Sequence, residues 1–143
     1  MRARARILLV DDDPVDREAV LRAFKAHKVV NPIFVAQDGV EALEFLRREG
    51  AFAEPDAAPS PSLILMDLGM PRMNGLECLR EIKDDPSLCH IPVVIFTSSR
   101  AEVDIVASFK HGAASYIAKP VTFDKLLAAI GTFDLYWTLS ELP

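Results

Sequence analysis

The sequence predicts a single α/β domain, in which an open parallel sheet is covered by helices on both faces. Short and almost continuously apolar runs alternate along the chain with amphipathic segments. Continuous apolarity is typical of parallel strands buried on both faces, whereas strands with one wet face alternate apolar and polar residues. The 143 residues suffice for one domain with a substantial buried core.

Five apolar runs are the candidate strands of this sheet. Parallel neighbours need crossover connections, usually helices, and right-handed crossovers place those helices on both sides of the sheet. The amphipathic segments between the runs are the candidate helices, so a strand followed by a helix is expected five times in order. The predicted strands occupy residues 6–10, 33–36, 63–66, 93–96 and 115–118.

Helix start signals follow four of these runs. Asp13 followed by Pro14 offers a cap with proline at the first helical position. Residues 38–41 and 74–77 resemble capping boxes, and Thr122 is a candidate cap for the last helix. Apolar residues that recur at helical spacing after the last three starts are Ala42, Phe45, Leu46, Leu76, Leu79, Ile82, Leu126, Leu127 and Ile130.

Two stretches stand outside the alternating pattern. Residues 49–62 contain three prolines and predict an exposed, mobile connection between the second helix and the third strand. Residues 131–143 carry several large apolar side chains and are too apolar for a free tail.

Composition excludes several classes of function. The net charge of -5 and the pI near 5.2 disfavour non-specific nucleic-acid binding, which needs concentrated Lys and Arg. No apolar run approaches the roughly 18 residues of a membrane span, and the chain lacks a signal-peptide core, so we expect a cytoplasmic protein without membrane contact. Cys78 and Cys89 have neither metal-ligand nor disulfide spacing and are expected to be free thiols.

Polar residues end the predicted strands, and ligands of open parallel sheets bind outside those carboxyl ends. Two carboxylates about 4 Å apart repel by roughly 4 kcal/mol at an effective dielectric of 20, so clustered acids call for a cation. Mg²⁺ prefers oxygen ligands, and Asp12 and Asp67 are candidates for direct ligands, with Asp11 holding a water. The residues at the strand ends are Asp11, Asp12, Asp67, Thr97 and Lys119.

The same residues suggest phosphoryl chemistry. A carboxylate such as Asp67 can attack phosphorus to form an aspartyl phosphate, whose remaining oxygens Lys119 and Thr97 would hold. Simpler roles remain open for each residue taken alone. Asp13 is better placed as a helix cap than as a metal ligand, Asp67 could start a turn, Thr97 could cap a helix beginning near Ala101, and Lys119 could be a surface cation. Their joint placement favours a site.

Five stretches together resemble a response regulator receiver domain of two-component signalling. They read ILLVDDDP at 7–14, DGVEAL at 38–43, LMDLGMPRMNG at 65–75, IPVV at 91–94 with Thr97 beyond it, and YIAKP at 116–120. The resemblance covers about residues 5–131. It implies a flavodoxin-like (βα)5 fold, a doubly wound five-stranded parallel sheet in the order 2-1-3-4-5. We divide the chain into a receiver domain at 1–131 and an aromatic extension at 132–143, within the same domain or at a dimer interface.

The resemblance also implies roles for the acids. Asp67 would accept a phosphoryl group from the phosphohistidine of a sensor histidine kinase, while Asp11, Asp12, Asp67 and the backbone carbonyl of Gly69 organise Mg²⁺. Family members often carry Asn where this chain has Gly69. A carbonyl ligand does not depend on the side chain, whereas side chains at this position can tune the lifetime of the phosphoryl group.

The resemblance further implies a switch. Lys119 would pair with the phosphoryl group, the Thr97 hydroxyl would capture a phosphoryl oxygen, and the Tyr116 ring would turn from exposed to buried. The surface expected to move spans residues 101–130. No output domain follows residue 143, so we expect the signal to leave through protein contacts.

A narrower resemblance is to stand-alone receivers that partner phytochrome-like kinases. It rests on the proline-rich stretch before the third strand, on Asp84-Asp85-Pro86 and on the C-terminal extension. We expect the extension to pack against the switch surface or a second copy, giving a homodimer; folding back onto its own domain is the alternative. The candidate interface residues are Phe133, Tyr136, Trp137 and Leu139.

The sequence disfavours three other functions. An aspartyl-phosphate phosphatase or mutase needs a second acid two positions beyond the nucleophile, and residues 67–69 read Asp-Leu-Gly. We therefore expect self-phosphorylation and self-dephosphorylation rather than enzymatic turnover. A flavodoxin-type binding module needs a phosphate cradle, which the acids at 11–13 would repel. A degenerate receiver is disfavoured because every motif residue is present.

Overall fold

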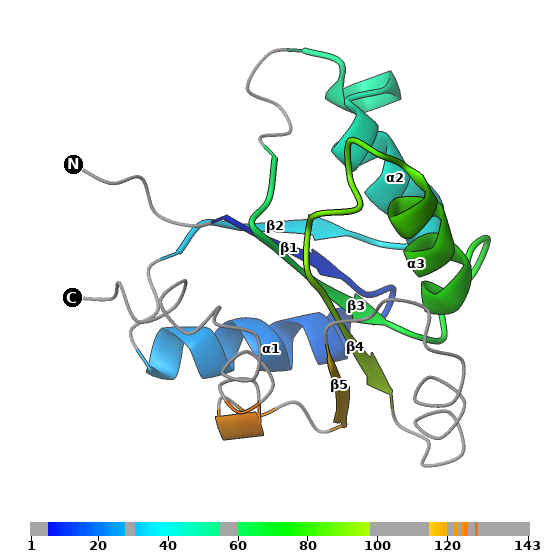
Figure 1. The fold of residues 1–143 in the computed structure, drawn as a ribbon. Coiled ribbons are helices and arrows are strands. Elements are labelled where there is room, and N and C mark those ends of the chain that lie inside the picture. Colours follow the sequence, from blue (N-terminus) through cyan, green and yellow to red (C-terminus); the bar gives the residue numbers. More distant parts are fainter. Residues whose placement is uncertain are drawn as a thin grey trace.

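A computed structural model of the chain describes residues 6–27, 31–54, 60–97, 115–119, 122, 124, 125 and 128. Figure 1 shows the helices and strands along the chain. They are β1 (Ile7–Val10), α1 (Pro14–Ala26), β2 (Ile33–Ala36), α2 (Gly39–Arg47), the 3-10 turn η1 (Gly50–Phe52), β3 (Leu63–Asp67), α3 (Gly75–Asp84), β4 (Val93–Thr97) and β5 (Ser115–Ala118). The predicted helices after β4 and β5 fall largely on residues outside these ranges.

The strands form a parallel sheet in the order β2-β1-β3-β4-β5. Strand β1 lies between β2 and β3, with Val10 opposite Ala36 of β2 on one side and Met66 of β3 on the other. The α/β class and the parallel sheet are therefore confirmed. This order makes β1 and β3 neighbours, so the residues that follow them emerge side by side.

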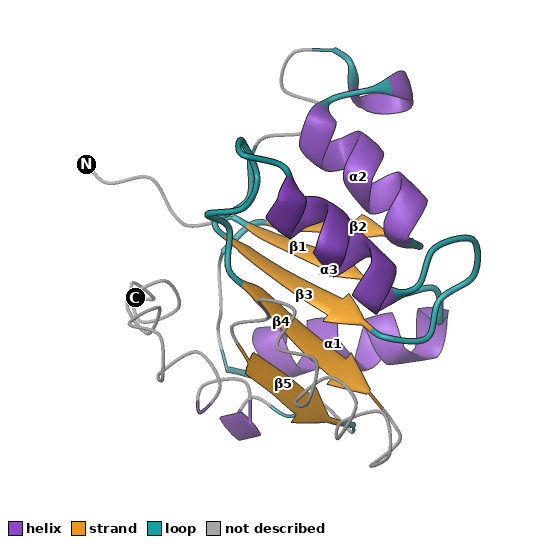
Figure 2. Ribbon diagram, turned by 45° about the vertical axis from the view of Figure 1, so that its right-hand side comes forward, coloured by secondary structure: helices purple, strands orange, loops and turns teal. Residues whose placement is uncertain are grey.

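The helices cover both faces of the sheet. Helix α1 lies on one face, and α2 and α3 lie together on the other (Figures 1 and 2). Successive residues of β1 alternate between these layers: Leu9 packs in the cluster that contains Phe24 of α1, and Leu8 packs in the cluster that contains Leu79 of α3. All four residues of β1 are buried, which explains the continuous apolarity of this run.

Strand β2 is an exception to the prediction of strands buried on both faces. It lies at the end of the sheet order, and its first three residues are only partly covered. Val35 retains 37% of its accessible surface. An end strand has a sheet neighbour on one side only, so its apolar composition does not guarantee burial.

The predicted capping residues are confirmed, but of the two predicted capping boxes only the one at 74–77 is complete. Asp13 caps α1 and precedes Pro14, so its side chain serves the helix. Helix α3 has a complete capping box, in which the Glu77 side chain also accepts from the backbone of Asn74. The side chains of Asp13, Asp38, Asn74 and Thr122 accept from the backbone N–H groups of Val15, Glu41, Glu77 and Lys125 at 2.8, 2.9, 2.9 and 3.2 Å.

The connection after α2 begins with an ordered turn, which the sequence interpretation missed. Residues 50–52 form η1, and the Phe52 ring packs edge-on against Phe45 of α2 with centroids 5.2 Å apart. Phe52 is partly buried against the core. The prediction of an exposed connection from residue 49 onward is therefore wrong for Phe52, because an aromatic ring close to a helix finds apolar surface there. Gly50 is exposed, as predicted.

The two cysteines are free thiols, as predicted. Cys78 is buried in α3, its thiol contacts the Gly39 carbonyl at 3.7 Å, and burial raises its pKa to about 12. Cys89 is exposed in the connection between α3 and β4. Across the described ranges of the chain, every helix is too short or too polar to cross a bilayer.

Candidate functional site

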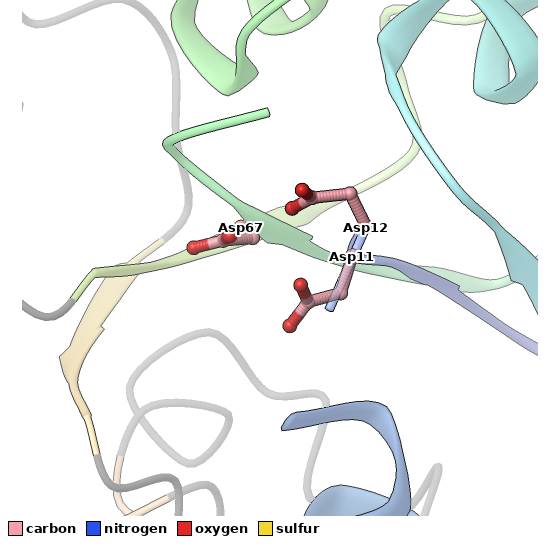
Figure 3. A group of neighbouring side chains, drawn as sticks. All are labelled: Asp11, Asp12 and Asp67. Atoms are coloured by element: carbon pink, nitrogen blue, oxygen red, sulfur yellow. The ribbon is translucent and has the colours of Figure 1, made fainter. Parts of the chain in front are cut away.

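Three carboxylates meet at the carboxyl ends of β1 and β3. Asp11 and Asp12 directly follow β1, and Asp67 is the last residue of β3. One carboxylate oxygen from each lies within 4.8 Å of the others. In Figure 3 the three side chains project from the two strand ends toward the same side. The predicted convergence of these acids is therefore present in the fold.

The end of β3 is fixed by its contact with the first residue of α3. Gly75 donates its backbone N–H to the Leu68 carbonyl at 2.8 Å, and Leu68 donates to the Phe96 carbonyl of β4 at 3.0 Å. A Cβ atom on Gly75 would lie 2.5 Å from the Asp67 carbonyl oxygen. Only glycine allows the helix to approach the strand this closely, and that approach sets where Asp67 emerges.

Asp11 is a buried acid with one unused oxygen. Its Oδ1 accepts from the Asp13 backbone N–H at 3.0 Å, while its Oδ2 has no hydrogen-bond partner among the groups that the structure describes. Burial raises the pKa of Asp11 to about 6, and the neighbouring charge of Asp67 adds to the rise. A buried carboxylate oxygen without a hydrogen bond is costly, so the donor set fits a divalent cation that prefers oxygen ligands.

Asp67 is also buried, and a lysine lies beside it. Burial raises the pKa of Asp67, and Lys119 opposes that rise through its charge and a hydrogen bond. The Lys119 ammonium lies 3.2 Å from Asp67 Oδ1 and 3.9 Å from Asp11 Oδ2. Lys119 follows β5 directly, so the predicted placement of a cation near the acids is observed.

Lys119 has a closer partner, Asp16 in the first turn of α1, which the sequence analysis did not place at the site. Asp16 Oδ2 lies 2.6 Å from the ammonium. Burial works against the charge of Lys119, but the hydrogen bond of Asp16 and the charges of Asp67 and Asp11 outweigh it and raise the lysine pKa. The two residues are 103 positions apart, and no local motif joins them.

The loop between β3 and α3 is tied to the start of α2. Arg72 has a positive φ of 61°, and its guanidinium donates to both carboxylate oxygens of Asp38 at 2.7 and 3.1 Å. Burial alone would raise the pKa of Asp38, but Arg72 and the cap hydrogen bonds lower it. This bidentate pair holds the segment that carries Gly69. Gly69 is exposed, and its role as a carbonyl ligand stays a prediction.

Other predicted site residues lie partly or wholly outside the description. Thr97 ends β4 and Tyr116 lies in β5, but their side chains are outside the described residues, so their switch roles stay predictions. The dimer candidates at 133–139 are outside the described residues altogether.

The sequence of the chain matches a known protein family. The family model of the response regulator receiver domain matches residues 7–131 of the chain. The chain belongs to the response regulator receiver family. The match includes both strand ends that carry the acids.

Receivers of the phytochrome-associated kind are among the relatives of this chain. Response regulator Rcp1 of Synechocystis sp. is 34% identical over 131 residues, which cover 92% of this receiver and 87% of Rcp1. The bacteriophytochrome response regulator RtBRR has a structure with a TM-score of 0.86 and 41% identity, covering 94% of this chain and 81% of that one.

Two further structures show relatives in liganded or modified forms. The phosphorylated cyanobacterial phytochrome response regulator RcpA has a TM-score of 0.77 and 35% identity, and 99% of each chain is covered. The Mn²⁺-bound form of Rcp1 has a TM-score of 0.75 and 33% identity, covering 97% of this receiver and 99% of Rcp1. The resemblance to phytochrome-associated receivers seen in the sequence is thus confirmed.

Proposed function

We propose that this receiver is the phosphoacceptor of a two-component system, in which Asp67 takes a phosphoryl group from a sensor histidine kinase and the resulting switch alters protein contacts. The observation that carries the proposal is the placement of a buried acid, Asp67, beside two further acids and within 3.2 Å of the Lys119 ammonium. A lone surface aspartate has neither a cation-binding neighbourhood nor a fixed countercharge.

The proposed step is a single displacement at phosphorus. A carboxylate oxygen of Asp67 forms the new O–P bond while the N–P bond to the histidine breaks, and the imidazole nitrogen keeps the electron pair. Lys119 holds positive charge beside the attacking oxygen and can pair with the oxygens of the transferred group. Its charge also opposes the effect of burial on the Asp67 pKa, which favours the ionised, nucleophilic form.

A divalent cation completes the site in this proposal. Asp11, Asp12 and Asp67 would hold Mg²⁺, together with the carbonyl of Gly69. When bound, the cation neutralises charge on the transferring phosphoryl oxygens. The Oδ2 of Asp11 supports this assignment, because it is a buried oxygen without a hydrogen-bond partner among the described groups and is therefore free to coordinate a cation.

The readout is proposed to be a population shift rather than further chemistry. Thr97 and Tyr116 would follow the phosphoryl group, moving the surface formed by residues 101–130. A shift from 1:99 to 99:1 needs about 5.5 kcal/mol of preference for one state, which several charge-assisted contacts can supply. We accordingly propose a signalling protein without enzymatic turnover, acting in the cytoplasm.

The test is phosphorylation by a small donor. Incubation with acetyl phosphate and Mg²⁺ is expected to add the mass of one phosphoryl group to the protein, and Asp67→Asn is expected to abolish that addition because the amide is a poor nucleophile. Intact-protein mass spectrometry measures both. Asp84→Asn, which replaces an exposed aspartate at the end of α3, is the matched control and should be modified like the wild type. Phosphorylation that persists in Asp67→Asn would move the acceptor elsewhere.

The partner is proposed to be a phytochrome-like histidine kinase. The support is the similarity to RtBRR and RcpA, which are both phytochrome response regulators. Phosphotransfer from an autophosphorylated kinase of this kind, compared with transfer from an unrelated histidine kinase, tests the assignment by relative rate.

We also propose a homodimer formed through Phe133, Tyr136, Trp137 and Leu139. The support is the concentration of large apolar side chains in this extension, which are favoured at interfaces. Removal of the residues after Gly131 is expected to convert a dimer to a monomer in analytical ultracentrifugation. An unchanged mass after truncation would remove the extension from dimerisation.

A further inference from the structure

Lys119 is shared between two acids that come from different elements. Asp16 on α1 lies 2.6 Å from the ammonium, and Asp67 on β3 lies 3.2 Å from it. The Lys119 side chain is only 17% exposed, whereas that of Asp16 is 37% exposed. The shorter contact is therefore made to the acid outside the cation-binding cluster.

This sharing affects what Lys119 does to the nucleophile. An ammonium has three N–H donors and is drawn to the nearest uncompensated negative charge. Without Asp16, the carboxylates left near it among the described residues are Asp67 and Asp11, and it would pair with them more closely. Such pairing would occupy oxygen lone pairs of Asp67 and place a positive charge where a divalent cation would bind.

We infer that Asp16 is a positioning residue for phosphoryl transfer: it holds the Lys119 ammonium partly toward α1 and so keeps Asp67 open to the cation and the phosphoryl donor. The inference rests on the proposed function of Asp67. It assigns a role to a residue that lies outside the cluster of Asp11, Asp12 and Asp67 and that, in the proposed step, does not bond to the phosphorus atom.

A structural role for Asp16 makes a different prediction. An acid in the first turn of a helix also interacts favourably with the helix dipole. Loss of that interaction would change stability by the same amount whether or not Lys119 is present. A positioning role instead requires that the effect of removing Asp16 depend on Lys119, which a double-mutant cycle measures.

The experiment compares Asp16→Asn with wild type by two readouts. We expect Mg²⁺ binding, measured by calorimetry on the unphosphorylated protein, to weaken about fivefold, and phosphorylation by acetyl phosphate to slow by a similar factor. In a Lys119→Met background, Asp16→Asn is expected to change Mg²⁺ affinity less than about twofold. Asp16→Glu, which keeps the carboxylate, should restore most of both values.

Glu18→Gln is the matched control, because Glu18 lies on the same helix and its side chain is 58% exposed in an ion pair with Arg22. It should leave Mg²⁺ affinity and the phosphorylation rate at wild-type values. Wild-type behaviour of Asp16→Asn, or an equal loss of Mg²⁺ affinity in both backgrounds, would overturn the inference. Failure of the proposed function would be seen in a different experiment, as phosphorylation of Asp67→Asn. The calorimetric double-mutant cycle measures Mg²⁺ binding alone and does not depend on phosphorylation.

Discussion

Gly75→Ala is expected to lower the free energy of unfolding by about 3 kcal/mol, at the upper end of overpacking effects. The added Cβ would lie 2.5 Å from the Asp67 carbonyl oxygen and 2.9 Å from the Leu68 Cα. Both are backbone atoms, so no side-chain rotation relieves the clash, and either α3 or the end of β3 must shift. Urea denaturation followed by circular dichroism measures the change.

The same substitution should disturb the site that β3 carries. Since the added Cβ would clash with the backbone of Asp67 itself, Mg²⁺ binding by Gly75→Ala is expected to weaken together with stability. Gly69→Ala provides a matched control for stability, because no atom lies within 4 Å of its added Cβ, and its free energy of unfolding should stay within about 0.5 kcal/mol of wild type. Equal stability of the two variants would show that α3 does not approach the strand as described.

Asp11→Asn is expected to stabilise the metal-free protein by about 2 kcal/mol at neutral pH. Burial raises the pKa of Asp11 from 3.8 to about 6, which corresponds to about 3 kcal/mol. Asp12, in the same cluster, is exposed, so solvent reaches this site and screens its charges. We therefore expect a gain in stability smaller than about 3 kcal/mol, namely about 2 kcal/mol. An amide at position 11 can still accept from the Asp13 backbone, and it removes the charge that is costly to bury.

The pH dependence gives this prediction its sign. Because the folded protein binds the Asp11 proton more tightly than the unfolded chain, the stability contributed by the protonated acid is present at low pH. It is lost as the pH rises from about 4 through about 6. The stabilisation by Asp11→Asn should therefore be small at pH 4 and complete above pH 7. Thermal or urea unfolding in metal chelator across this range measures it.

Mg²⁺ should reverse the ranking of the two proteins. A cation that binds only the folded state stabilises it by mass action, and wild type should gain more than Asp11→Asn, which has lost a carboxylate ligand. Asp13→Asn is the control: Asp13 is an exposed cap, asparagine caps equally well, and its stability should stay within about 0.5 kcal/mol of wild type with or without Mg²⁺. Equal Mg²⁺ stabilisation of wild type and Asp11→Asn would exclude Asp11 from the cation site.

The elements that could be predicted from the sequence are those defined by local signals. Strand β1 is a continuous apolar run with all of its residues buried, and α3 begins with both halves of a capping box. The exposure of Val35 follows from the end position of β2, which the resemblance implied through the strand order but which the apolar run itself does not reveal. The packing of Phe52 could not be predicted, because it depends on the surface that α2 offers. Sequence spacing carries no information about either.

The residues of the site likewise fall into those that local sequence signals predict and those that they do not. Asp11, Asp12 and Asp67 could be predicted because each stands at the end of an apolar run, and parallel topology brings such ends together. The Asp16 contact could not, since an acid in the first turn of a helix has a sufficient local explanation. The direction of its side chain toward Lys119 becomes visible only once α1 and β5 are placed in three dimensions.

The contrast between the two thiols makes this receiver suitable for site-specific fluorophore attachment. The chain has two cysteines, and the buried Cys78, with a pKa raised to about 12, presents almost no thiolate to a maleimide reagent. Cys89 is exposed in the connection that leads into β4. A dye placed there reports on the wild-type molecule without engineered substitutions, at the strand whose last residue is Thr97.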